Sequence, residues 1–312
     1  MEHTHNNAIF GPVPSRRLGL SLGIDLLTFK TCSLDCLYCE LGLTTSLTCQ
    51  RGRFRDYQDV LRQVEKRLRE LDRQPDSLTI SGSGEPTLHL DLSKTLDGLR
   101  LISPVKRVVI TNSTLMSLPE VRNDLSKADI VAPSLDAISQ KVFSRLNRPA
   151  PGIKVADMVK GLIAFREQYS GQIWLEILLV AGINDSPKEL DKLREAARRI
   201  SPDVIQLNTI VRPPALPGFA PVEAKRLAAI AASFELPTQA ITSSQAQGVS
   251  DNARPEQIII HTIQMRPCTL PDLQQISRLS HEELTQLLQK LTSECRIKTE
   301  IYDGRRYYRG LI

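Results

Sequence analysis

The stretch Lys30-Thr-Cys32-Ser-Leu-Asp-Cys36-Leu-Tyr-Cys39-Glu40 holds three cysteines within eight residues and follows an apolar run, Ser21–Leu27. A compact apolar run of this length predicts a buried strand. The thiols therefore leave a strand end on a loop, where α/β barrels carry their sites. The other cysteines are scattered, so we expect a metal site in a reducing compartment and no disulfide framework.

The pattern around this loop predicts an α/β fold. Short apolar runs alternate with segments of helical periodicity as far as about Leu236, which is typical of repeated βα units. The expected strands are Ser21–Leu27, Ser77–Ser81, Arg107–Thr111, Asp129–Pro133, Trp174–Val180 and Asp203–Leu207. The expected helices are Tyr57–Asp72, Leu90–Leu101, Leu118–Ser126, Lys154–Gln168, Pro187–Ile200 and Pro221–Ser233. Six such units with right-handed crossovers predict a partial (β/α)6 TIM-like barrel.

A smaller domain is expected at the C-terminal end. Residues 242–255 are polar and have no apolar period, as in a linker. The dipeptide Asp303-Gly304 between two β-prone runs is a strong hairpin signal. The elements expected after the linker are Glu256–Gln264, Leu270–Ile276, His281–Glu294, Arg296–Tyr302 and Arg305–Arg309. This order predicts a winged helix-turn-helix domain at 256–312, following a barrel domain at 1–241.

Composition indicates a folded globular protein. Apolar residues make up 41% of the chain and charged residues 24%, close to the average for such proteins. No apolar run reaches the roughly 20 residues that cross a bilayer, and Met1–Asn7 does not have the character of a signal peptide. We expect a cytoplasmic protein with no membrane partner. The formal charge of +5 is compatible with an anionic partner.

The cysteine triplet is suited to an iron–sulfur cluster. The thiolates of Cys32, Cys36 and Cys39 can bind three irons of a [4Fe–4S] cluster. The fourth iron then has no cysteine ligand, and an open position suits a ligand that arrives with a cofactor or substrate. Structural zinc is the alternative, but it normally uses two separated cysteine pairs. Cys49, Cys268 and Cys295 are interpreted as small buried hydrophobic residues.

The spacing C-x3-C-x2-C, with the aromatic Tyr38 before the last cysteine, resembles the signature of the radical S-adenosylmethionine (SAM) superfamily. Gly82-Ser-Gly84-Glu85-Pro86 resembles the Gly-Gly-Glu motif of that superfamily, with Ser83 where a glycine often stands. The resemblance implies that Glu85 receives the amino group of SAM, while Gly82 and Gly84 let the backbone approach the ligand. A plain β-turn is the alternative.

Polar residues also follow the third and fourth expected strands. Thr111-Asn112-Ser113 and Ser134-Leu-Asp136 offer hydroxyl, amide and carboxylate groups, which suit sugar hydroxyls. The resemblance implies that Asn112, Ser134 and Asp136 bind the ribose of SAM. Ordinary turns or helix caps are the alternative for both segments.

Several charged residues can be interpreted either as parts of a functional site or as ordinary structural or surface residues. Arg16 and Arg17 suit a phosphate or carboxylate ligand, or structural ion pairs. Arg212 suits an anionic substrate or an exposed position, and Glu176 is either an inward-pointing charge or an edge carboxylate. The basic run of Arg51, Arg53 and Arg55 is interpreted as a solvated loop.

A narrower resemblance covers about residues 10–235. The segments 11–23 and 206–214 look like the iron–sulfur oxidoreductases related to wyosine-base-forming tRNA enzymes. This resemblance suggests RNA as the substrate. The wyosine-forming enzymes carry a second cluster on additional N-terminal cysteines, and residues 1–31 contain no cysteine. That particular reaction is therefore not expected.

The resemblance implies an enzyme that reductively cleaves SAM at its cluster to a 5′-deoxyadenosyl radical, which abstracts hydrogen from a substrate. A donor such as flavodoxin or ferredoxin would supply the electron, and no residue is assigned as general acid or base. RNA modification is the first hypothesis, since the segment 305–309 is basic and aromatic. The alternatives are an activator of the glycyl-radical type acting on a protein partner, and a non-enzymatic cluster-bearing regulator that binds DNA.

Overall fold

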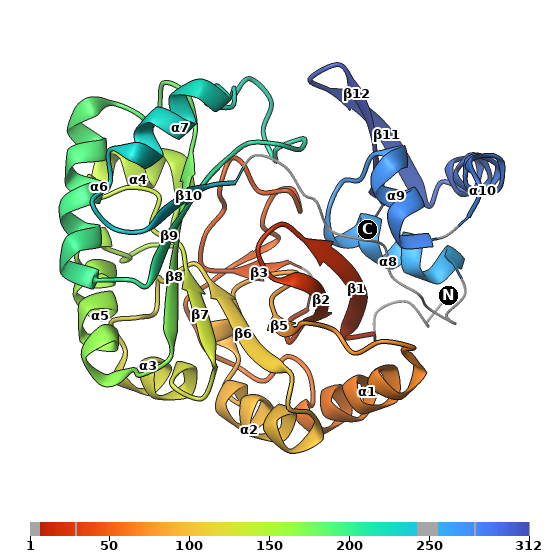
Figure 1. The fold of residues 1–312 in the computed structure, drawn as a ribbon, viewed down its shortest axis with the longest axis horizontal. Coiled ribbons are helices and arrows are strands. Elements are labelled where there is room, and N and C mark those ends of the chain that lie inside the picture. The colour runs from red at the N-terminus through yellow and green to blue at the C-terminus, as the bar shows by residue number, and fades with distance from the viewer. Residues whose placement is uncertain (1–6, 29, 242–254, 278, 312) are drawn as a thin grey trace.

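A computed structural model describes residues 7–28, 30–241, 255–277 and 279–311 (Figure 1). Its largest sheet has eight strands in the order β1-β2-β5-β6-β7-β8-β9-β10. These strands are β1 (Ile9–Ser15), β2 (Gly19–Ile24), β5 (Ser77–Ile80), β6 (Lys106–Thr111), β7 (Ile130–Pro133), β8 (Gln172–Leu179), β9 (Val204–Thr209) and β10 (Thr238–Ala240). β1 and β2 pair antiparallel, and every later neighbour pairs parallel. The predicted six-stranded parallel core is therefore confirmed.

Helices cover the outer side of the curved sheet, as Figure 1 shows for α1, α2, α3, α5 and α6. The helices of this part of the chain are α1 (Tyr57–Glu70), α2 (Leu92–Ile102), α3 (Pro119–Leu125), α4 (Gln140–Asn147), α5 (Val155–Gln168), α6 (Pro187–Ile200) and α7 (Ala224–Ala232). A 3-10 turn, η1 (Pro86–Leu88), follows β5, and the short strands β3 (Thr31–Cys32) and β4 (Ser46–Leu47) pair parallel. The α/β partial barrel expected from the sequence is observed.

Six elements were not expected from the sequence, namely β1, β3, β4, η1, α4 and β10. β1 contains two prolines and a shift of register between Phe10 and Val13, so it lacks the regular alternation of a strand. β10 has only three residues, none of them buried. α4 is eight residues long and buries only Phe143, Leu146 and Asn147. Short or irregular elements like these carry little periodic signal.

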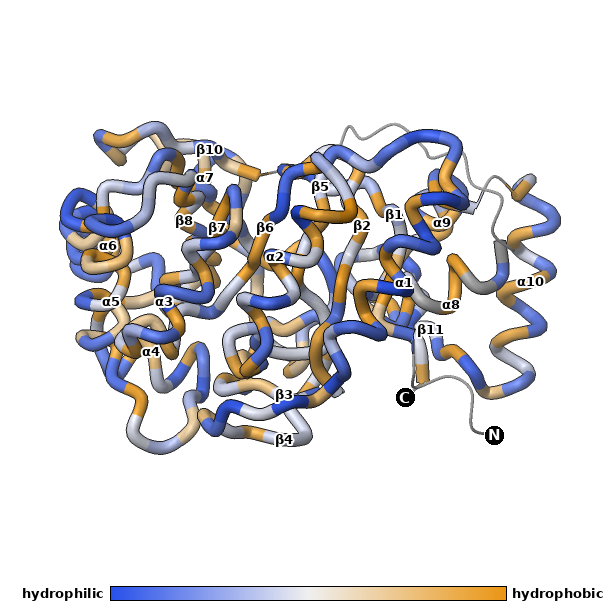
Figure 2. The backbone as a smooth tube through the Cα atoms, turned by 90° about the horizontal axis from the view of Figure 1, so that it is seen from below, coloured by the Kyte–Doolittle hydropathy of each residue, from blue (hydrophilic) through white to orange (hydrophobic). Residues whose placement is uncertain are grey.

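The C-terminal residues form a module with its own apolar core. It contains α8 (Pro255–Met265), α9 (Leu270–Ser277), α10 (His281–Ser293), β11 (Ile297–Tyr302) and β12 (Arg305–Gly310). α10 alternates between hydrophilic and hydrophobic residues along its length, as Figure 2 shows. Its buried residues, Leu284, Leu288 and Leu291, share one face. Three helices and a hairpin are thus observed in the expected order, and the winged-helix interpretation rests on that order.

The C-terminal module packs beside β1, at one edge of the sheet (Figure 1). Tyr307 donates a hydrogen bond of 3.1 Å to the carbonyl of Val211, and Arg309 donates one of 2.9 Å to the carbonyl of Pro213. Both acceptors lie in the loop after β9, so the hairpin of the module contacts the carboxyl end of a barrel strand. The expected linker lies outside the described residues, except Pro255, which begins α8. In the described residues, no helix is long and apolar enough to cross a membrane.

Candidate cofactor and substrate site

The thiol loop, residues 30–40, connects β2 to α1 and carries Cys32, Cys36 and Cys39 as free, partly buried thiols. Asn112 places its amide nitrogen 3.5 Å from the sulfur of Cys32. Asn147 places its amide nitrogen 3.4 Å from the sulfur of Cys36. The predicted triplet therefore lies on one loop, and two amide side chains from α4 and the end of β6 orient two of its sulfurs.

The donor chemistry of this loop fits a [4Fe–4S] cluster, which is normally held by cysteine thiolates. Burial raises the pKa of the Cys32 thiol to about 12 and also raises the pKa of Cys36. In the metal-free loop Cys32 and Cys36 are therefore protonated thiols, and binding of iron to them would release protons. Among the described residues, no three His, Cys, Asp or Glu side chains are arranged to hold a single metal ion.

The glycine motif lies against the thiol loop. A Cβ on Gly84 would collide with the carbonyl oxygen of Thr31, and one on Gly82, whose φ is +144°, would meet Asp25. Ser83 donates from its hydroxyl to Asp25, at 2.6 Å. Two close backbone approaches therefore require the two glycines, and the serine between them has a hydrogen-bond partner of its own.

Glu85 is only 1% exposed and accepts four hydrogen bonds. The hydroxyls of Thr87 and Thr111 each donate to Oε1 at 2.6 Å, the amide of Thr87 donates at 3.0 Å, and the amide of Asn112 donates to Oε2 at 2.7 Å. Burial raises the pKa of this carboxyl despite these donors. In this arrangement Glu85 joins η1 to the end of β6. Its role toward the amino group of SAM stays a prediction.

Asp136 joins the fourth parallel strand of the barrel, β7, to the thiol loop. Its carboxylate accepts hydrogen bonds from the Tyr38 hydroxyl, from the Asn147 amide at 2.7 Å and from the Leu178 amide at 2.9 Å. Burial raises its pKa. Because Asn147 also reaches Cys36, one network connects Asp136 to a predicted iron ligand. No motif in the sequence indicated Asn147, which lies at the end of the unexpected helix α4.

A cavity of about 400 Å³ opens beside this network. Five of the predicted site residues line it: Tyr38, Cys39, Gly82, Ser134 and Asp136. The other predicted site residues, Cys32, Cys36, Gly84, Glu85 and Asn112, are not among the lining residues. Asn112 instead donates to the Ser33 hydroxyl at 2.9 Å and accepts from the Thr114 hydroxyl at 2.7 Å. The structure thus brings half of the predicted site residues together around one cavity.

Charged residues line another part of the same cavity. Arg17 forms an ion pair with Glu176, so both residues point inward. Arg212 pairs with Glu40 at 3.2 Å, and the alternative of an exposed Arg212 is thereby excluded. Arg16 and Arg266 also line the cavity. Arg266 follows α8 in the C-terminal module, and the sequence analysis did not assign it to the site.

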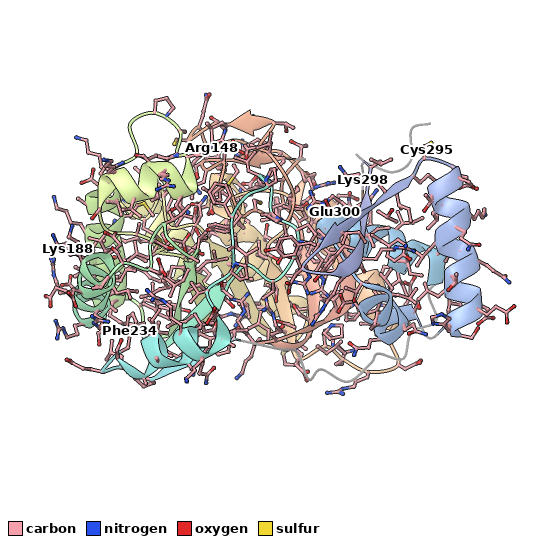
Figure 3. All side chains as sticks on the ribbon, turned by 90° about the horizontal axis from the view of Figure 1, so that it is seen from above. Arg148, Lys188, Phe234, Cys295, Lys298 and Glu300 are labelled. Atoms are coloured by element: carbon pink, nitrogen blue, oxygen red, sulfur yellow. The ribbon has the colours of Figure 1, made fainter. Side chains whose placement is uncertain are left out.

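Two sequence interpretations need correction. The run from Arg51 to Arg55 is solvated only in part. Arg53 is exposed, but Arg51 is largely buried and donates to the Thr87 carbonyl at 2.9 Å, and Arg55 donates to the Leu27 carbonyl at 3.0 Å. Cys295 is exposed, because it follows the C-terminal end of α10 (Figure 3), while Cys268 is buried and Cys49 packs against the barrel core as expected.

Comparison with known proteins agrees with this geometry. Residues 26–197 match the model of the radical SAM superfamily. A UPF0026 protein of Methanocaldococcus jannaschii is 31% identical over 311 residues, which are 96% of this chain and 94% of that protein. A GTPase Obg of Brachyspira hyodysenteriae is 34% identical over 306 residues, 95% of this chain, but the chain spans only 44% of that protein.

More distant matches extend the comparison. A dual-specificity RNA methyltransferase RlmN of Nitratidesulfovibrio vulgaris is 31% identical over 216 residues, 62% of this chain and 57% of that protein. The solved structure of TYW1 with a lysine-pyruvate adduct superposes with a TM-score of 0.53 at 17% identity, covering 72% of this chain and 75% of that one. This last likeness concerns the fold. The chain belongs to the UPF0026 family within the radical SAM superfamily and is an enzyme that uses a [4Fe–4S] cluster and SAM.

Proposed function

We propose that Cys32, Cys36 and Cys39 hold the cluster, and that the adjoining cavity holds SAM together with a substrate from which hydrogen is abstracted. One observation carries the proposal: Tyr38 and Cys39 of the thiol loop line the same cavity as Gly82, Ser134 and Asp136. A reduced cluster held by Cys32, Cys36 and Cys39 would supply the electron for cleavage of SAM to methionine and a 5′-deoxyadenosyl radical. The protein positions both molecules and excludes water.

The surrounding residues have distinct proposed tasks. Ser134 lines the cavity, and its hydroxyl has no hydrogen-bond partner among the described residues, so it is available to a ribose hydroxyl. Asp136 has two carboxylate oxygens, which accept from three groups and retain capacity for a further donor. Glu85 holds the end of β6 in place, and its carboxylate favours an ammonium group nearby.

We propose RNA as the substrate. The RlmN relatives are named as RNA methyltransferases, and four arginines line the cavity: Arg17, which pairs with Glu176, and Arg16, Arg212 and Arg266. Guanidinium groups bind phosphates through paired hydrogen bonds. Arg305 and Arg306 on β12 are exposed and suit contact with a phosphate backbone. A flavodoxin or ferredoxin as electron donor and a cytoplasmic location complete the proposal.

The reaction can be tested with anaerobically reconstituted protein, dithionite and SAM, using 5′-deoxyadenosine as the product. We expect the wild type to form it and Cys36→Ala to form none. Cys49→Ala is the matched control, because Cys49 packs against the core outside the thiol loop, and it should behave like the wild type. A wild type with a fully loaded cluster that forms no 5′-deoxyadenosine under any reductant would refute the proposal.

The substrate needs a separate experiment. Cellular RNA and a tryptic digest of cellular protein are each incubated with enzyme and SAM, and SAM cleavage is measured. RNA as substrate predicts that cleavage rises with RNA and returns to the basal rate after ribonuclease treatment. Stimulation by protein alone would contradict RNA and favour the activator hypothesis.

A further inference from the structure

Besides Arg17, which pairs with Glu176, three arginines line the cavity, and they come from three different elements. Arg16 follows β1, Arg212 follows β9 and Arg266 follows α8, and we call these residues the arginine group. Each is partly buried. The group therefore brings together the edge of the sheet, the carboxyl end of a barrel strand and the C-terminal module.

The arginine group carries more positive than negative charge. The acidic residues that act on it are Glu40 and Asp272. Glu40 pairs with Arg212, and Asp272 accepts two hydrogen bonds of 2.9 Å from the amide and hydroxyl of Thr269. Within the described ranges, no carboxylate lies at ion-pair distance from Arg16 or Arg266. Two of the three guanidinium groups thus form no ion pair, although the charges of Glu40 and Asp272 act on Arg16 from a greater distance.

Buried polar atoms around the arginine group also have no partner. The Nε atoms of Arg212 and Arg266 and the Oδ1 atom of Asn208 are buried and make no hydrogen bond in the described part of the chain. Unpaired buried polar atoms are rare and cost roughly 1–3 kcal/mol each. Burial and the neighbouring charge of Arg212 lower the pKa of Arg16. The two unpaired Nε–H groups are donors, so an anionic ligand, which accepts hydrogen bonds, would satisfy both.

We propose that the arginine group binds a phosphate group of the substrate, and that Arg266 makes the C-terminal module part of the substrate site. The inference rests on the proposed function, because the same cavity would hold SAM. Phosphate fits better than carboxylate, since its additional oxygens can accept from several guanidinium groups at once. Glu40 directly follows Cys39, so its pair with Arg212 links the phosphate subsite to the thiol loop.

Binding without turnover tests this subsite. Reconstituted protein without reductant is titrated calorimetrically at fixed ionic strength with inorganic phosphate and, separately, with a short single-stranded RNA. The variants are Arg16→Gln and Arg266→Gln, which lie on different elements, and Arg16→Lys, which keeps the charge. Arg199→Gln on α6 is the matched control, because Arg199 is exposed and does not line the cavity. Iron content and the unfolding temperature confirm that each variant is folded and loaded.

We expect each glutamine variant to weaken phosphate binding about tenfold or more, as for loss of a charge-assisted hydrogen bond. Arg16→Lys should lose less, and Arg199→Gln should match the wild type. Parallel weakening of RNA binding would identify a phosphodiester of RNA as the source, while unchanged RNA binding would identify a small phosphate ester. Equal phosphate affinity in all variants, or no phosphate binding by the wild type, would overturn the inference. Failure of the wild type to cleave SAM would instead refute the proposed function, since titration needs no cleavage.

Discussion

Two polar clusters, the carboxylates of Asp136 and Glu85 and the arginine group, differ in how completely their polar groups are paired. The carboxylate of Asp136 accepts three hydrogen bonds and that of Glu85 accepts four. The arginine group instead includes buried nitrogen atoms with no partner among the described residues. Fully hydrogen-bonded carboxylates such as these hold their neighbours in place before any ligand binds. Unpaired buried nitrogen atoms lower the stability of the fold, and a protein typically keeps such atoms at functional sites.

The largest expected effect is at the thiol loop. Alanine at Cys32, Cys36 or Cys39 should remove nearly all bound iron after anaerobic reconstitution, because each thiolate would hold one iron of the cluster. Cys49→Ala should bind as much iron as the wild type, since it packs against the barrel core. Iron and sulfide analysis measures the difference. An equal loss of iron in Cys49→Ala would contradict the assignment of the cluster to the three cysteines of the thiol loop.

A smaller effect is expected at Asp136, and it lies in stability. Asp136→Ala leaves the Tyr38 hydroxyl and the Asn147 amide without their buried acceptor. At about 1–3 kcal/mol for each of these two unsatisfied groups, the free energy of unfolding should fall by roughly 2–6 kcal/mol. Urea denaturation of the metal-free protein gives this value. Asp136→Asn, which keeps an acceptor, should lose less, and equal losses would contradict the hydrogen-bond explanation.

The far end of the barrel gives a reference for pH dependence. Burial alone would raise the pKa of Asp129, but hydrogen bonds from the side chain and amide of Arg107 outweigh it and lower the pKa. The carboxylate therefore stabilises the fold above its unfolded pKa of about 3.9, and this contribution is lost as the pH falls through the lower folded value.

Asp129→Asn should accordingly lower stability near pH 7 by at most about 1 kcal/mol, since the carboxylate is partly exposed. The variant should also flatten the fall in stability below about pH 4. Urea denaturation between pH 3 and 7 measures both, and SAM cleavage should stay unchanged. A variant as acid-sensitive as the wild type would show that the Arg107 pair contributes nothing to acid stability.

The smallest effect in stability is expected at Arg16. Because Arg16 has no carboxylate at ion-pair distance in the described residues, Arg16→Gln should change the free energy of unfolding by no more than about 0.5 kcal/mol. Urea denaturation of the metal-free protein measures it beside Asp136→Ala. If Arg16→Gln lowered the free energy of unfolding as much as Asp136→Ala does, Arg16 would be a structural residue. The difference between the hydrogen-bonded carboxylates and the arginine group would then not hold.

The sequence contained the barrel and the thiol loop because both are local patterns. Buried parallel strands such as β5 and β7 are short apolar runs, and the cysteine spacing lies within one loop. Elements with little hydrophobic periodicity, such as β1 and α4, were not predicted. For the same reason Asn147, which follows no motif, was not assigned to the site.

The position of Arg266 in the cavity could not be predicted from the sequence, because it depends on how the C-terminal module packs against the barrel. Arg266 reaches the cavity only because the C-terminal module packs against β1 and the loop after β9. No local sequence pattern predicts where the C-terminal module packs on the barrel. The choice between a ligand-binding role and a structural ion pair, open for Arg17 in the sequence, depended likewise on Glu176, which is distant in sequence.

The central claim is that SAM binds in the cavity beside a cluster held by Cys32, Cys36 and Cys39. Electron paramagnetic resonance of the dithionite-reduced, fully loaded wild type, recorded with and without SAM, tests it most directly. We predict that SAM changes the spectrum of the reduced cluster, as expected when a ligand reaches its open iron. An identical spectrum at saturating SAM would contradict the account.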